Sequence, residues 1–309
     1  MALLQTWDEI VASTMRSENT IREDLQDAIW NVTPHETPLL SRMSQAPVDN
    51  DYVQWLVDVY ADAATNAQLE GIAFTHLSLT VPTRAANITQ IFYKGGMIAD
   101  RARAVARAGM NDPFVYYEGK HVVEIKRDME LAIVKGSAVT GTTSSANQMN
   151  GFLNFLSSNN TVMSGITLTE EKFNDVLELT WGNTAMMPNE VYVGPKLRRT
   201  ISLYSTNVTR YEDASAKRQI LTTGQYDSDF GLVHHNLHRD LASAATGTAN
   251  ELLVIDPNWF ATGWLQPLRR EVLSRDGKRD RYMISAEFTV LFRNEAAGAA
   301  VTGCFPYIV

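Results

Sequence analysis

One long amphipathic helix is the feature that most constrains what this chain can fold into. Between Pro113 and Lys135 apolar residues recur at helical spacing. Asn111 or Asp112 can cap the start of this helix, and Gly136 suits its C-terminal stop. The spacing predicts a helix over 113–135, longer than the average helix of globular proteins. Its apolar stripe comprises Phe114, Tyr117, Val122, Ile125, Met129 and Ile133.

Composition indicates a globular protein and excludes several classes. The 309 residues are 45% hydrophobic and 20% charged, and the formal net charge is −8, whereas tight nucleic-acid binders concentrate positive charge. Cys304 is the single cysteine, so no internal disulfide can form, which fits a reducing cytoplasm. Residues 1–11 lack the basic start and apolar run of a secretory signal, and the uncharged stretch 136–169 is too polar to span a bilayer.

The N-terminal third contains segments with little core of their own. Residues 1–48 have a polar start followed by Pro34, Pro38 and Pro47, which predicts an extended arm. Alternating apolar residues predict a strand over 51–60, and a second extended stretch runs over 84–93. The connection between these strands, 61–81, is mostly small or polar. We therefore expect a hairpin that projects from the body and needs a partner surface.

The rest of the chain predicts a mixture of segregated helices and strands, which favours an α+β fold over a doubly wound sheet. Thr169 is expected to cap a helix that ends at Gly182. The other expected elements are a strand over 190–193, a helix over 195–204, a hairpin over 219–233, a buried strand over 251–255 and a long alternating strand over 282–293.

Several sequence blocks, in order along nearly the whole chain, resemble one protein family. They are 22–27, 29–42, 66–71, 87–91, 210–218, 226–231, 255–267 and 278–298, with Ile29-Trp30-Asn31-Val32-Thr33-Pro34-His35-Glu36-Thr37-Pro38 in the second block. They are similar to the major capsid proteins of tailed bacteriophages, in a branch long known as a domain of unknown function.

The resemblance implies the Hong Kong 97-type capsid fold. Residues 1–48 would then be an N-terminal arm and 49–94 an extended β-hairpin loop. Residues 95–164 and 251–309 would form a peripheral domain with 113–135 as its spine helix, and 165–250 would form an axial domain that meets its copies at the capsomer centre. The arm motif begins almost at once, so a separate scaffold protein, or none, is implied.

Three strings resemble parts of a protein kinase, but their context argues against one. They are Val123-Glu124-Ile125-Lys126, Asp229-Phe230-Gly231 and His238-Arg239-Asp240-Leu241. The first lies on the predicted helix with no glycine-rich loop before it, and the other two occur in the reverse of the kinase order. Ala245 stands where the metal-binding asparagine would be.

Charged and histidine clusters also have simple interpretations. His234 and His235 are neighbours on a predicted strand and point to opposite faces, so a zinc site that includes His238 is disfavoured. The Glu170-Glu171 pair suits the first turn of a helix. A basic run around a turn at Asp276-Gly277 could contact packaged DNA, but is better read as solvated or paired with carboxylates of a neighbour. The run comprises Arg269, Arg270, Arg275, Lys278, Arg279 and Arg281.

The sequence therefore predicts a structural protein with no catalytic, cofactor or metal site. It would self-assemble into hexamers and pentamers of an icosahedral head shell that encloses double-stranded DNA, in virions assembled in the host bacterial cytoplasm. Expected partners are further copies, a portal protein, and possible scaffold and decoration proteins, with weak DNA contact and no membrane. The alternatives are an encapsulin-like cellular compartment and a soluble cytosolic enzyme. The residues expected to form inter-subunit contacts are Arg22, Glu36, Leu39, Leu40, Trp55, Val57, Glu70, Arg84 and Ile91.

Overall fold

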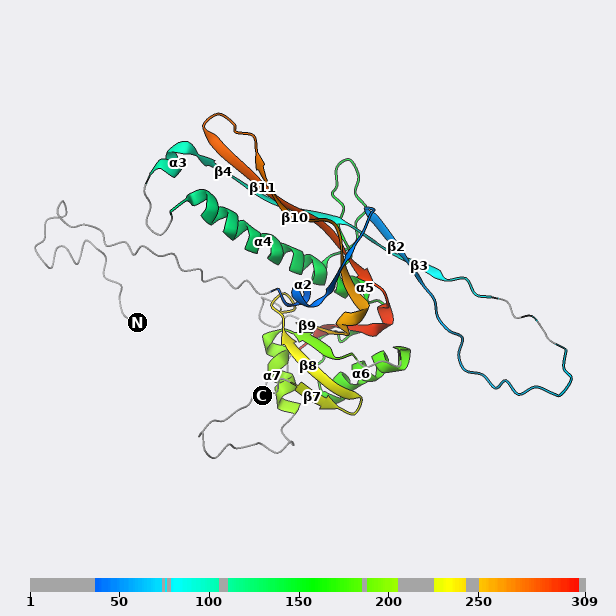
Figure 1. Cartoon of the computed structure of the whole chain (residues 1–309). Helices are drawn as coiled ribbons and strands as arrows, with labels where there is room; N and C mark the ends of the chain where they lie inside the picture. Colours follow the sequence, from blue (N-terminus) through cyan, green and yellow to red (C-terminus); the bar gives the residue numbers. More distant parts are fainter. Residues whose placement is uncertain are drawn as a thin grey trace, which may run out of the picture.

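A computed structural model describes residues 37–73, 76, 79–105, 111–184, 188–204, 225–242 and 250–305. Figure 1 shows an elongated sheet lined by one long helix, a smaller sheet with two helices below it, and a loop that extends far to one side. Most strand pairs are antiparallel, so the sheets are not doubly wound and the predicted α+β class is confirmed.

The larger sheet has four strands in the order β1-β10-β11-β4. β10 and β11 pair antiparallel along most of their lengths, β4 pairs antiparallel with β11, and β1 adds in parallel to the start of β10. Their bounds are Ser44–Pro47 for β1, Phe260–Leu273 for β10, Arg279–Phe292 for β11 and Gln90–Ala99 for β4. β11 starts and ends close to the predicted strand, whereas β10 and β1 were not expected.

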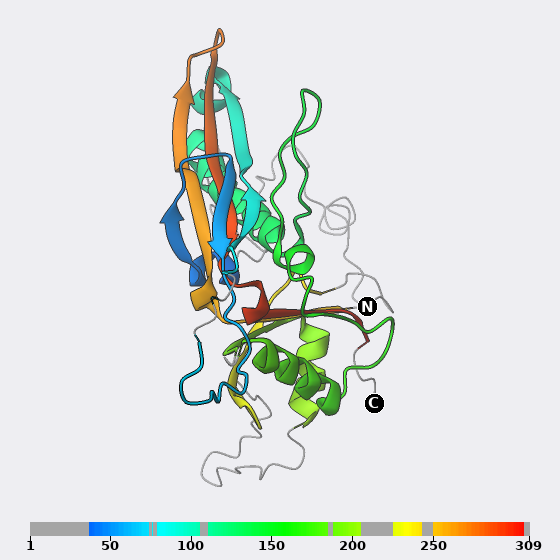
Figure 2. The same cartoon turned by 90° about the vertical axis from the view of Figure 1, so that its right-hand side faces the viewer.

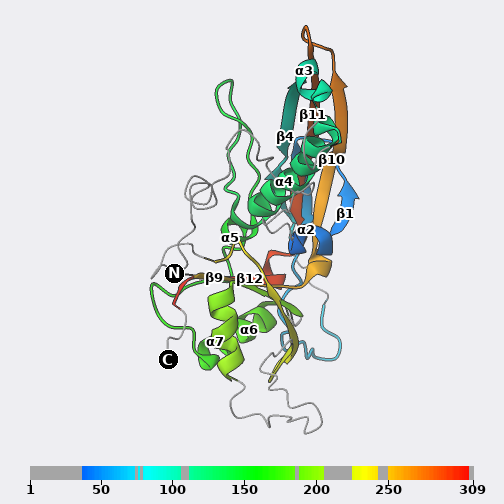
Figure 3. The same cartoon turned by 90° about the vertical axis from the view of Figure 1, so that its left-hand side faces the viewer.

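Helix α4 (Pro113–Lys135) lies along one face of this sheet, as Figure 3 shows. Its bounds are those predicted from the sequence. The Asp112 carboxylate caps the helix by accepting a hydrogen bond from the backbone N–H of Phe114 at 2.9 Å, and the N–H of Gly136 closes the last turn on the carbonyl of Ala132. The apolar stripe is buried as expected at Phe114, Ile125, Met129 and Ile133.

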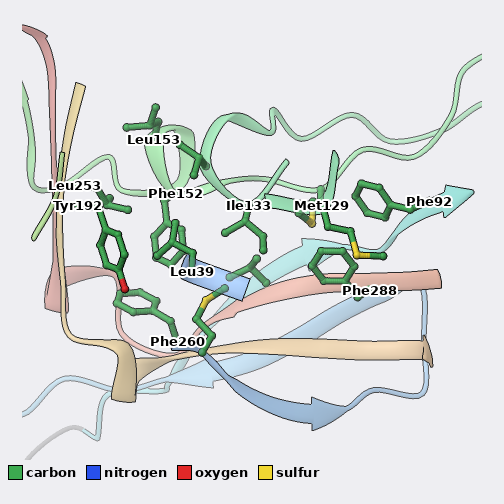
Figure 4. Packing of buried hydrophobic residues seen from close by; sticks show 14 of the residues in the cluster. Leu39, Phe92, Met129, Ile133, Phe152, Leu153, Tyr192, Leu253, Phe260 and Phe288 are labelled. Carbon is green, nitrogen blue, oxygen red and sulfur yellow. The ribbon is translucent and has the colours of Figure 1, made fainter. Parts of the chain in front are cut away.

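The main hydrophobic core lies between α4, the large sheet and the short helix α5 (Phe152–Phe155). Figure 4 shows Met129 and Ile133 of α4 near Phe288 of β11 and Phe92 of β4. Aromatic rings provide much of its volume: Phe152 packs edge-to-face on Phe260 and Phe292, with ring centroids 5.0 Å apart in both pairs. This packing fixes the long helix against the sheet.

The smaller sheet has six strands in the order β5-β12-β9-β6-β8-β7. Helices α6 (Glu170–Thr184) and α7 (Pro195–Tyr204) contribute to a second core on one side of it. Its central strands are buried on both faces. The strand bounds are Asn160–Val162 for β5, Gly298–Cys304 for β12, Asn250–Ile255 for β9, Glu190–Val193 for β6, Gly231–Leu237 for β8 and Gln225–Ser228 for β7.

The projecting hairpin consists of β2 (Tyr52–Val57) and β3 (Thr83–Ile88), which form a two-stranded antiparallel sheet. The connection between them extends away from both larger sheets (Figure 1). The remaining short elements are α2 (Pro38–Arg42), α3 (Asp100–Ala104), η3 (Pro257–Trp259) and η4 (Glu295–Ala297).

Two local predictions need correction. Helix α6 continues through Gly182 to Thr184, because Gly182 has open space around it and no close backbone contact requires the helix to end there. The extended stretch predicted over 84–93 is two strands: β3 ends at Ile88, and β4 begins at Gln90 and leaves the hairpin for the large sheet.

Sheet membership does not follow the predicted domain boundaries. β9 and β12 were expected in the peripheral domain, yet they pair within the sheet that holds β6 and β8 of the 165–250 segment. The side chains of β9 explain this position, because Leu252 and Val254 enter the core on the side of α6 and α7 while Leu253 and Ile255 enter the main core. The two cores therefore share one sheet, and the naming of peripheral and axial domains stays a prediction.

Candidate functional site

The segment predicted as the arm is anchored by a buried carboxylate on α4. Glu130 is 1% exposed, and its two carboxylate oxygens accept hydrogen bonds from the backbone N–H groups of Leu39 and Leu40 at 2.8 and 2.9 Å. His238, at the end of β8, places Nε2 2.8 Å from the same carboxylate. Its Nδ1 accepts a hydrogen bond from the backbone N–H of Asp240, so Nε2 carries the proton and donates. Three donors thus satisfy Glu130, and three distant segments meet there. We call this group the Glu130 clasp.

A second polar contact holds the end of α2. The Arg42 guanidinium lies 2.5 Å from the Glu190 carboxylate on β6, and the Tyr192 hydroxyl donates to the other Glu190 oxygen at 2.7 Å. Burial, followed by the hydrogen bond to Glu190, raises the pKa of Tyr192 far above its usual range, so its hydroxyl remains a donor. The short helix is therefore tied to α4 by Glu130 and to the small sheet by Glu190.

The two arm leucines expected at a subunit interface occupy different environments. Leu39 is fully buried in the main core of its own chain, so it has no surface to offer a neighbour, and that prediction is corrected. The backbone N–H groups of Leu39 and Leu40 donate to Glu130, and this contact holds the start of α2 against α4, where the Leu39 side chain enters the core. Leu40 is half-buried and lines a groove of about 830 Å³ beside Trp264 and Met129.

The base of the projecting hairpin packs on its own subunit. Trp55 is half-buried, and its ring centroid lies 6.3 Å from that of Phe155. Asn87, on β3, is 3% exposed: its side-chain nitrogen donates to the carbonyls of Asn150 and Val290, and its side-chain oxygen accepts from the backbone N–H of Asn150. Trp55 therefore contributes in part to internal packing. Asn87, which belongs to the resemblance block 87–91, has a structural role that the sequence did not assign to it.

The remaining predicted contact residues lie apart from one another. Val57 is half-buried at the end of β2, while Glu70 and Arg84 are exposed, and the structure gives neither of these two an ion pair within its described ranges. Ile91 was expected on the hairpin but belongs to β4 of the large sheet, where it is 64% exposed. Arg22 and Glu36 lie outside the described residues.

The enzyme-like strings lie in the structural contexts expected for them. Residues 123–126 are part of α4, and 229–231 form the turn into β8, where Gly231 has a φ of 136°. His238 belongs to the Glu130 clasp, and His235 is buried, which lowers the pKa of its ring to about 4. Within the described ranges, His, Cys, Asp and Glu side chains form no group of three or more able to hold a metal ion.

Three of the six cations of the basic run, Arg269, Arg270 and Arg275, pair with carboxylates of their own chain. Arg270 contacts Glu118 on α4 at 2.7 Å, and Arg275 contacts Asp280 at 2.8 Å and also Asp100. The carboxylate partners expected on a neighbour are in these cases internal. The turn predicted at Asp276-Gly277 is present, with Gly277 at a φ of 62°.

Large apolar side chains gather on the projecting loop instead of in a core. Val59, Tyr60, Leu69, Ile72, Leu79 and Val81 are each more than half exposed. Exposed apolar groups concentrated on one loop indicate an interaction surface. None of the helices in the described ranges has the length and apolarity needed to cross a membrane.

Comparison with solved structures shows that this fold is shared with capsid proteins. The chain matches a structure from Gordonia phage Cozz at a TM-score of 0.62 and 10% identity, covering 92% of this chain and 91% of that one. It matches the capsid of an empty GTA particle at 0.63 and 12% identity, covering 94% and 99%. The SrpI encapsulin of Synechococcus elongatus PCC 7942 matches at 0.58 and 9% identity, covering 97% and 98%. The Hong Kong 97-type fold implied by the sequence resemblance is thereby confirmed.

Sequence comparison identifies the family. The major capsid protein of Escherichia phage Phieco32 is 28% identical over 110 residues, which span 35% of this chain and only 31% of that protein. The sequence profile of the SU10 major capsid protein family matches residues 10–305, and so takes in nearly all of the fold described above. The chain belongs to the SU10 major capsid protein family.

Proposed function

We propose that this protein is the subunit that builds the icosahedral head shell of a tailed bacteriophage, through hexamers and pentamers that close around double-stranded DNA. The observation that carries the proposal is the loop between β2 and β3, whose apolar side chains have no core within their own subunit. Tyr60 is 99% exposed and Leu79 is 91% exposed. Their burial against neighbouring copies would contribute a favourable term at every contact in the shell.

Weak contacts repeated over many copies suit this role. A single loop contact can break and re-form, whereas a closed shell engages many such contacts at once. We expect assembly in the host bacterial cytoplasm and a location in the virion. Further partners are a portal protein at one vertex and possible scaffold and decoration proteins. The role is structural, without catalysis.

The test is to purify the chain and fractionate it by sedimentation, with electron microscopy of each fraction. Closed shells support the proposal, and DNA-filled heads that contain this chain in virions complete it. A small discrete oligomer would instead support the soluble-enzyme alternative. Because the SrpI encapsulin shares the fold, shells that enclose a protein cargo without DNA would support the cellular compartment.

The loop supplies the matched variants. Leu79→Ser with Val81→Ser removes two exposed apolar groups, so shell yield should fall while the unfolding midpoint of the free subunit stays unchanged. Asn66→Ser, an exposed polar change in the same loop, should leave shell yield as it is. Equal shell yields from the wild type, the Leu79→Ser, Val81→Ser double variant and the Asn66→Ser variant would contradict a role of the loop in assembly. The residues that remain proposed contacts between subunits are Arg22, Glu36, Leu40, Trp55, Val57, Glu70, Arg84 and Ile91.

A further inference from the structure

The turn between β10 and β11 contains Asp276 followed by Gly277, the single Asp-Gly pair of the sequence. Figures 1 and 2 show this turn in orange at the tip of the large sheet. Both residues are exposed, and Gly277 has a φ of 62°. A Cβ atom placed on Gly277 would have no neighbour within 4 Å, so the backbone of the turn is open to solvent.

The two groups of an Asp-Gly pair that can react with each other are both unpaired in this turn. Within the described ranges nothing accepts a hydrogen bond from the Gly277 N–H, and no cation contacts the Asp276 carboxylate, since the neighbouring Arg275 pairs with other carboxylates. The turn is closed through a different atom, because the Asp276 N–H donates to the carbonyl of Arg279 at 3.3 Å. The Gly277 nitrogen and the Asp276 carboxyl are therefore free to approach each other.

The chain also contains one Asn-Gly pair, Asn150-Gly151, which is closed by the fold. Gly151 is buried, its N–H donates to the carbonyl of Gly136 at 2.9 Å, and a Cβ on it would lie 2.6 Å from the Gly136 nitrogen. The Asn150 side-chain oxygen is buried, and its backbone is bonded to the Asn87 side chain at 2.9 and 3.1 Å. The nitrogen of Gly151 can therefore reach the Asn150 side chain only after local unfolding.

These two environments reverse the chemical order of reactivity. A carboxylate repels an incoming nucleophile more than a neutral amide does, so Asn-Gly pairs react faster than Asp-Gly pairs in unfolded chains. In the folded subunit the more reactive pair, Asn150-Gly151, is enclosed, and the less reactive pair, Asp276-Gly277, is open.

We infer that Asp276-Gly277 is a site of spontaneous isomerisation to isoaspartate in the folded subunit, while the fold suppresses the corresponding reaction at Asn150. In the first step the Gly277 nitrogen bonds to Cγ of the protonated Asp276 carboxyl and loses its proton, and the carboxyl hydroxyl leaves with that proton as water. The product is a five-membered succinimide ring. Water then adds to one of the two ring carbonyls. Opening at the main-chain carbonyl gives isoaspartate, and opening at Cγ restores aspartate, so neither step needs an oxidant or a reductant.

The modification lengthens the tip of the sheet without changing its charge, because isoaspartate carries the main chain through its Cβ and Cγ. The residues beside the turn hold α3: Arg275 forms an ion pair with Asp100, and the Lys278 carbonyl accepts a hydrogen bond from the Asp100 N–H at 3.0 Å. A longer turn displaces Arg275 and Lys278 relative to each other. Isomerisation at Asp276 is therefore expected to loosen α3 from the end of the large sheet.

The experiment compares the two sites in one chain. The free subunit is incubated at neutral pH and physiological temperature, both folded and in guanidinium chloride, and its peptides are analysed by mass spectrometry. Isoaspartate keeps the mass of aspartate and is recognised by chromatography and by an isoaspartyl methyltransferase, whereas deamidation of Asn150 changes the mass. Asn150 should convert at least about tenfold more slowly in the folded subunit than in the denaturant, because its reaction requires local unfolding. Asp276 should convert at similar rates in both. Conversion of Asn150 ahead of Asp276 in the folded subunit would overturn the inference.

Two controls isolate the role of the turn. Asp62 is exposed and is followed by Ala63, so isoaspartate forming there as fast as at Asp276 would reduce the reaction to exposure alone. Asp276→Glu keeps the charge but could close only a six-membered ring, so isoaspartate should disappear from the turn. Hydrogen exchange in α3 should become faster on ageing in wild type and stay constant in Asp276→Glu; isoaspartate without this difference would contradict the loosened tip. All these measurements use the free subunit, so they do not depend on whether shells form.

Discussion

The His238 ring nitrogen Nε2 lies 2.8 Å from the Glu130 carboxylate, and both side chains are almost completely buried. The same carboxylate accepts two backbone N–H groups of the arm, so one side chain of α4 connects the arm, the long helix and the segment after β8. A buried acceptor with three donors stabilises a fold only while all of them remain in place.

Replacement of Glu130 tests the clasp. Glu130→Ala would leave the N–H groups of Leu39, Leu40 and His238 without their acceptor, and we expect a loss of roughly 3–5 kcal/mol in the free energy of unfolding, because each unpaired buried donor costs about 1–3 kcal/mol. Urea denaturation of the free subunit gives this value. Asp128→Asn is the matched control on the same helix: its ion pair with Lys94 is half exposed, so a loss below about 1 kcal/mol is expected. Equal losses in the two variants would contradict a special role for Glu130.

A comparison of two neighbouring leucines tests the corrected position of the arm. Leu39→Ala should lower the free energy of unfolding by about 2–5 kcal/mol, because Leu39 is fully buried in the main core. Leu40→Ala should lower it by less, because Leu40 is half-buried along the groove. Thermal unfolding of free subunits measures both. Should Leu39→Ala impair shell yield with no change in subunit stability, the original expectation of an inter-subunit contact would be restored.

The root of the hairpin depends on Asn87. Its side chain makes hydrogen bonds with Asn150 and Val290 from a buried position, so Asn87→Ala should cost about 2–3 kcal/mol through the unpaired backbone groups that it leaves. Hydrogen exchange should show faster exchange at β3 in this variant. Asn66→Ala, in the exposed loop, serves as the control and should change neither quantity.

His235 predicts an acid-sensitive subunit. Burial lowers the pKa of its ring from 6.5 to about 4, so the folded state resists a proton that the unfolded state accepts. The stability associated with the neutral ring is fully present above pH 6.5 and is lost as pH falls from 6.5 toward 4, by on the order of 3 kcal/mol. Urea midpoints measured across this range should decline in wild type and decline less in His235→Phe. An unchanged slope in the variant would assign the pH dependence to other groups.

Local patterns predicted local structure well and long-range pairing poorly. The bounds of α4 follow from Asp112, Pro113 and Gly136, which act within one turn of the helix ends. β10 was missed because its sequence places Pro267, Arg269 and Arg270 within one strand, and its register shifts on either side of Gln266. A strand of that composition is held by pairing with β11, which no local window contains.

The contact surfaces could be predicted only in part, because they also depend on pairing between residues far apart in the sequence. The weakly apolar stretch 61–81 indicated a projecting loop, and its exposed side chains agree with that expectation. Leu39 and Glu130 could not be paired from the sequence, because their interaction joins residues 91 positions apart and depends on the direction of two backbone N–H groups. The outward position of Ile91 depends equally on the break between β3 and β4 at Thr89.

Strand β1 has a consequence for the order of events during synthesis. The Ser44 hydroxyl contacts the carbonyl of Phe260, 216 residues later, and β1 pairs in parallel with β10. On a ribosome the arm would emerge early and find its strand partner only after most of the chain had followed. Pairings between such distant segments form slowly, because a large loop must close first. β1 is therefore among the last strands to be fixed, and a nascent subunit would present this part of the arm in its final place only when the large sheet is nearly finished.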